Sequence, residues 1–180
     1  LRIYGSSEFM LESGAPNKSY ITSFISEANN DHGQFLVIDT PARISARDYP
    51  FLSICDFIFV PTSCSDADIY ATHDFLNQLV NDGIFAHAKA NQKPCIVLLP
   101  NQVVSMKDIS ELRVAFQNFP ALLGKPLPYS LQMRKAFRHD SDDKNLIKLL
   151  KHTRSYFDWM NALIAGGLPL PLKVNSLYQL

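Results

Sequence analysis

The sequence has 180 residues, and its hydrophobic fraction of 47% is sufficient for one globular domain with a sizeable core. Its 17 basic and 17 acidic residues balance, so the protein has no net charge that would attract nucleic acid or acidic substrates. A local basic patch is still compatible with this balance. No apolar run approaches the roughly 18 residues of a membrane-spanning helix, and no secretory signal is recognisable, so we expect no membrane association.

The expected elements alternate between strands and helices along the chain. Continuous apolar runs predict strands buried in a parallel sheet, and apolar residues at helical spacing predict helices. The strands are expected at 1–5, 34–40, 56–62 and 94–100. The helices are expected at 17–31, 45–55, 66–83, 105–119 and 131–139, followed by a long helix, and residues 125–130 are expected to be extended.

Two helices carry clear sequence signals. Ser105 and Asp108 have the spacing of a capping box at the start of the helix over 105–119. The long helix is expected to end at Gly166 and Gly167, and its apolar stripe consists of Leu146, Leu149, Leu150, Thr153, Phe157, Met160 and Ile164. These elements predict the α/β class, with a mostly parallel sheet and helices on both faces. The domain is expected over 1–165, with a tail over 166–180.

Polar residues follow three of the expected strands at the point where each strand ends. These strand exits are Asp39-Thr40-Pro41, Pro61-Thr62-Ser63 and Pro100-Asn101-Gln102. Because ligands of open α/β sheets bind beyond the carboxyl ends of the strands, the three exits predict a binding site at one edge. Asp39 is the strongest candidate, since a carboxylate directly after four apolar residues is typical of a phosphate or metal site.

The segments around these exits resemble the ParA/MinD group of deviant-Walker ATPases, in particular its plasmid-partition and VirC1-like members. The likeness spans roughly residues 1–140 and includes "IVLLPNQV", which contains Asn101, and "LPYSLQMRKAFRHD". It rests mainly on "FLVIDTPARIS" and "ICDFIFVPTSCSDADIYAT", where the residues that match the family pattern are Ile38-Asp39-Thr40-Pro41, Asp56, Pro61, Ser65, Asp68 and Ala71.

The resemblance implies a P-loop NTPase-like fold and an ATPase that acts in plasmid or DNA segregation or transfer. By this likeness, Asp39 is the catalytic carboxylate that organises Mg²⁺ through water. Thr40 and Pro41 then lie beside the nucleotide, and Asn101 reads the adenine. The family also implies ATP-dependent homodimerisation and a ParB-like centromere-binding or relaxosome-type partner protein.

A basic cluster is the expected DNA contact. Arg134, Lys135 and Arg138 lie within five residues, at i, i+1 and i+4 of a predicted helix, and the resemblance assigns such a cluster to non-specific DNA binding or the dimer surface. Lys148, Lys151 and Arg154 are expected on the exposed side of the next helix. Two ordinary solvated helix faces are the alternative interpretation of these charges.

The sequence also departs from the family pattern. The signature KGGxGK[ST] and the following D-x-D segment are absent, and Ala42 replaces a family proline. The stretch "ESGAPNKS" ends like a P-loop, but Pro16 has no N–H and the carboxylate of Glu12 would repel phosphate. We therefore expect the P-loop upstream of Leu1, and ATP and Mg²⁺ to need that longer chain. The alternative is a non-catalytic pseudo-ATPase or interaction module with the same fold.

The cysteines and histidines give no sign of a disulfide framework or a metal site. Cys55, Cys64 and Cys95 are far apart in apolar surroundings, which predicts reduced thiols and the cytosol. No histidine has metal-ligand spacing with another histidine or a cysteine. The resemblance refines the expected location to the nucleoid within the cytoplasm. Tyr156, Phe157 and Trp159 are expected to be core and rim aromatics and not a platform for stacking bases.

Overall fold

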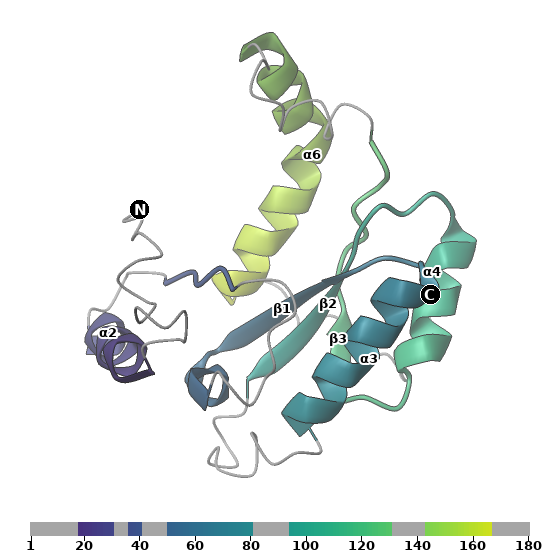
Figure 1. Cartoon of the computed structure of the whole chain (residues 1–180). Coiled ribbons are helices and arrows are strands. Elements are labelled where there is room, and N and C mark those ends of the chain that lie inside the picture. The colour runs from purple at the N-terminus through teal and green to yellow at the C-terminus, as the bar shows by residue number, and fades with distance from the viewer. Residues whose placement is uncertain (1–17, 31–35, 41–49, 81–93, 131–142, 167–180) are drawn as a thin grey trace. The chain divides into compact units, whose positions relative to one another are not determined.

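The computed structural model describes residues 18–30, 36–40, 50–80, 94–130 and 143–166 (Figure 1). The chain divides into two compact units. The first comprises Leu1–Asp56 and Phe75–Pro94, and the second comprises Phe57–Asp74 and Cys95–Leu180. Within the described ranges, no helix combines the length and apolar character needed to cross a membrane.

The second unit is built on a three-stranded parallel sheet. Its strands are β1 (Phe57–Thr62), β2 (Cys95–Pro100) and β3 (Ala121–Leu123), in the order β1-β2-β3 (Figure 1). The β1–β2 register runs from Phe57 opposite Cys95 to Thr62 opposite Pro100. Each parallel connection contains a helix, α3 (Asp66–Val80) and then α4 (Met106–Phe116). The predicted α/β class is therefore confirmed, as are the strands expected at 56–62 and 94–100.

Helices cover both faces of this sheet (Figure 1). On one face, Val97 and Leu122 form a buried cluster with Leu163 of α6 (Asp143–Ile164), and Trp159 packs against it. On the opposite face the alternate strand residues Ile58, Val60, Ile96 and Leu98 are buried, and α4 contributes the buried residues Ile109, Leu112 and Phe116. Because these residues are buried, the core of this unit lies in the two layers between the sheet and its helices. Full burial of one such aliphatic or aromatic side chain stabilises a fold by roughly 1.5–3 kcal/mol.

The first half of α3 is fixed to α4 by a histidine. His73 Nε2 lies 2.9 Å from the Ala115 carbonyl oxygen. The imidazole ring also makes an edge contact with Phe119, with 4.8 Å between ring centroids, and a tilted contact with Phe116 at 5.5 Å. A polar ring placed between two phenylalanines and a helix carbonyl has a structural role, because its contacts join α3 to α4.

The first unit contains α2 (Lys18–Asn30) and the 3-10 helix η2 (Pro50–Ile54), which contact each other. Ile21 and Ile25 of α2 are buried, as are Phe51 and Leu52 of η2. The helix expected at 17–31 is confirmed. Of the helical stretch expected at 45–55, the described part forms only this short 3-10 helix.

One strand prediction is wrong, and one strand was not predicted. Residues 36–40, expected within a buried strand, form no strand, and Val37 is 76% exposed. The third strand of the sheet is instead β3, which no sequence pattern predicted. The expected extended piece over 125–130 does make one bridge, between Pro128 and Val103. The elements expected at 1–5 and 131–139 lie outside the described residues, as do residues 167–180 of the tail expected over 166–180.

The long helix α6 is confirmed, but part of its predicted apolar stripe is wrong. Thr153, Tyr156 and Leu163 are buried, whereas Phe157 is 47% exposed. The buried face of α6 therefore includes Tyr156 and Leu163 in place of Phe157, and is rotated about the helix axis relative to the predicted stripe. The helix ends at Ile164, and Gly166 follows with φ +70°, a conformation that glycine adopts without a steric penalty.

Candidate functional site

Two of the three predicted strand exits lie side by side. Thr62, at the end of β1, is opposite Pro100, at the end of β2. The backbone N–H of Asn101 donates a hydrogen bond of 2.7 Å to the Thr62 carbonyl oxygen. The parallel arrangement thus brings polar residues that are about 40 positions apart in sequence to one edge of the sheet, as predicted.

The exit of β1 is occupied by an internal hydroxyl pair. Thr62 is only 2% exposed, and its Oγ1 accepts a hydrogen bond of 3.1 Å from Thr72 Oγ1 of α3, which is also buried. A buried hydroxyl must be paired to avoid a desolvation penalty. Thr62 and Thr72 satisfy each other, so Thr62 holds α3 to the sheet and does not offer its side chain to a ligand.

The serines after β1 cap helix α3. Ser65 Oγ accepts a hydrogen bond of 3.2 Å from the Asp68 backbone N–H, and Ser65 N–H donates to Ser63 Oγ at 3.2 Å. Ser63 Oγ in turn donates to the Asp68 carboxylate. A carboxylate in the first turn also interacts favourably with the positive end of the helix dipole. The Ser65–Asp68 spacing, part of the resemblance, therefore has a helix-capping function here.

The exit of β2 is a constrained loop. Asn101 Oδ1 accepts a hydrogen bond of 2.9 Å from the Gln102 backbone N–H, and Gln102 has φ +56°. This left-handed conformation is uncommon for a residue with a Cβ. The side-chain nitrogen of Asn101 has no hydrogen-bond partner within the described ranges. This amide donor of Asn101 is therefore left for a ligand.

A second segment, residues 124–129, fixes this loop from the other side. Leu127 N–H donates to the Pro100 carbonyl oxygen at 2.8 Å, and Val103 N–H donates to the Leu127 carbonyl oxygen at 3.1 Å. Tyr129 N–H then donates to the Val103 carbonyl oxygen at 2.9 Å. The sequence predicts an extended segment here but not this pairing. The prolines at 126 and 128 were its only signal, because they exclude a helix.

Replacing Gln102 with glycine is expected to raise the free energy of unfolding by up to about 1 kcal/mol, since relief of the left-handed backbone exceeds the entropy cost of glycine. Gln117 is a matched control, because its φ is −56° and Gln117→Gly should lower the free energy of unfolding. Urea denaturation of both variants measures the two effects. A loss of stability in Gln102→Gly would show that the glutamine side chain makes contacts that outweigh the strain.

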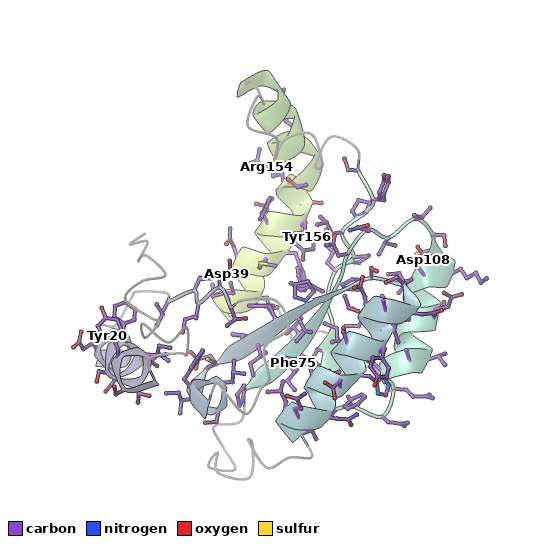
Figure 2. All side chains as sticks on the ribbon, viewed as in Figure 1. Tyr20, Asp39, Phe75, Asp108, Arg154 and Tyr156 are labelled. Carbon is purple, nitrogen blue, oxygen red and sulfur yellow. The ribbon has the colours of Figure 1, made fainter. Side chains whose placement is uncertain are left out.

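Asp108 organises the start of α4 (Figure 2). Its Oδ2 accepts hydrogen bonds from Val104 N–H at 2.7 Å and from Ser105 N–H at 3.1 Å, and its Oδ1 accepts from Ser105 Oγ at 2.8 Å. The predicted capping box of Ser105 and Asp108 is confirmed. The Val104 N–H bond, followed by the bonds from Ser105, lowers the pKa of Asp108, because these donors stabilise the carboxylate.

The lowered pKa of Asp108 makes stability depend on pH. A carboxyl group with a folded-state pKa below its unfolded value stabilises the fold above the unfolded pKa, near 4, and this contribution is lost as the pH falls through the folded pKa. We expect wild type to be more stable than Asp108→Asn at pH 6, and the difference to shrink by pH 3. Urea titrations at both pH values test this. A difference that does not change with pH would assign the effect to cap geometry alone.

The three cysteines are free thiols. Burial raises the pKa of Cys64, and the charges of Asp108 and Glu111 raise it further, so the thiol stays protonated and donates to the Asp108 carbonyl oxygen at 3.2 Å. Burial raises the pKa of Cys55 to about 11, with an added effect of the Asp56 charge. Reactive cysteines have lowered pKa values, so neither thiol has the properties of a nucleophile.

The remaining predicted site residues belong to the first unit or lie outside the described residues. Asp39, labelled in Figure 2, is exposed. Thr40 is half-buried, and both residues belong to the first unit. Pro41 lies outside the described residues, as do the expected DNA-binding residues Arg134, Lys135 and Arg138. Within the part of the chain that the structure describes, no group of three or more histidine, cysteine or acidic side chains could hold a metal ion.

The sequence matches no protein-family model, and it gives no significant match to a curated protein or a solved structure. Fold and site therefore define the class of this protein. It is an α/β protein with a three-stranded parallel sheet, in which β1 and β2 end side by side at a constrained polar loop.

Proposed function

We propose that the chain is a ParA-like partition ATPase, or part of one, that acts in the segregation or transfer of plasmid DNA. One observation carries the proposal. Asn101 stands at the carboxyl end of the central strand β2, its backbone is fixed to Thr62, and its side-chain nitrogen is left without a partner in the described residues. A fixed amide at this edge suits recognition of a purine base, because preorganised donors lose little freedom on binding.

The other roles follow from the resemblance. By this likeness, Thr40 and Pro41 lie beside the nucleotide. Asp39 is an exposed carboxylate, and carboxylate oxygens are suitable Mg²⁺ ligands, directly or through water. Bound Mg²⁺ would neutralise charge on the ATP phosphates. The proposed partners are a second copy of the chain, non-specific DNA and a ParB-like or relaxosome-type protein.

A titration with AMP and GMP tests the adenine contact in the chain as it stands, because neither nucleotide depends on a loop for the outer phosphates. Millimolar AMP is expected to shift the amide NMR signals of Asn101 and Gln102, and GMP to shift them less. Asn101→Asp keeps the Oδ1 acceptor for Gln102 N–H but removes the amide donor. We expect this variant to lose the preference for AMP, about tenfold for one hydrogen bond to a base.

Ser110→Ala serves as the control, since Ser110 is exposed on α4 and its hydroxyl bonds only within the helix, to the Met106 carbonyl oxygen. This variant should keep the preference for AMP. Equal shifts with AMP and GMP, or shifts confined to other parts of the chain, would contradict the role of Asn101 as the adenine reader.

The second candidate function is a non-catalytic interaction module with the same fold. One observation favours it: Val104 is 80% exposed and Met106 is 74% exposed, immediately after the β2 exit. Apolar side chains exposed together mark protein-interaction surfaces more often than isolated ones do. The nucleotide titration separates the two functions, because a module of this kind requires no response to AMP at Asn101.

A further inference from the structure

We draw no further inference here: the strongest candidate, the outer edge of strand β1, which has no paired strand among the described residues, carries none because nothing in the structure shows what covers it.

Discussion

Replacing Gly124 with alanine is expected to lower the free energy of unfolding by about 1–3 kcal/mol through overpacking. A Cβ at this position would lie 2.8 Å from Trp159 Cη2, 3.0 Å from the Leu98 carbonyl oxygen and 3.1 Å from Leu99 Cδ2. The Leu98 carbonyl oxygen cannot move away, because Leu98 belongs to the central strand and this oxygen accepts a hydrogen bond of 2.8 Å from the Gly124 N–H. The indole of Trp159 must therefore move, which disturbs the packing of α6 on the sheet.

A double-mutant cycle identifies the clash as the cause. Urea denaturation followed by far-UV circular dichroism would be measured for Gly124→Ala alone and in a Trp159→Leu background. The cost of the alanine should be smaller when the indole is absent, because the two residues are in contact. Trp159 is the one tryptophan of the sequence, so its fluorescence also reports the displacement directly. Equal costs in both backgrounds would show that the Leu98 carbonyl, and not the indole, limits the space.

The parts of the fold that sequence predicted are those with strong local signals. The apolar runs that became β1 and β2 are six residues long in the structure, and each is followed by a helix with a side-chain cap. At α4 the Ser105 and Asp108 spacing fixed the first turn correctly, because the capping bonds are made within four residues. Local chemistry of this kind does not depend on the rest of the chain.

The strand predictions fail where pairing with a neighbouring strand determines the structure. β3 is only three residues long, and alanine and leucine are good helix formers, so propensity indicated no strand. It forms a strand because it pairs in parallel with Ile96–Leu98 of β2. Residues 36–40 show the converse: their hydrophobicity predicted a strand, but the described structure gives them no strand partner. An apolar run reports a preference for burial and does not identify the partner.

The candidate site shows the same division. Placement of Thr62 and Asn101 at one edge followed from the parallel topology alone. The pairing of Thr62 with Thr72, the left-handed Gln102 and the contacts of Leu127 with the loop depend on tertiary packing, for which the sequence has no periodic signal. For this reason the sequence predicted the edge of the sheet at which the polar residues lie, but not which of them already have hydrogen-bond partners within the protein.

Binding of non-specific duplex DNA is expected to weaken steeply with salt if Arg134, Lys135 and Arg138 contact phosphates. Each neutralised phosphate releases condensed counterions and contributes about −0.9 to the slope of log K against log salt. Three contacts give a slope of about −2.7, or a roughly 40-fold loss of affinity between 50 and 200 mM salt.

The second set of basic residues lies on α6. Lys151 and Arg154 are exposed there as expected, but Arg154 Nε lies 3.8 Å from Asp158 Oδ2, and this carboxylate weakens the attraction of Arg154 for a phosphate.

The test is a fluorescence-anisotropy titration of duplexes of unrelated sequence at several salt concentrations. Replacing Arg134, Lys135 and Arg138 with alanine should reduce the magnitude of the slope by about 2.7 for every duplex, because phosphate contacts carry no sequence information. Lys107→Ala is the control: this lysine is 82% exposed on α4, where it lies 3.5 Å from Glu111, and it should leave the slope unchanged. An unchanged slope in the triple variant, or an equal change in Lys107→Ala, would exclude the basic cluster as the DNA contact and leave it as an ordinary solvated face.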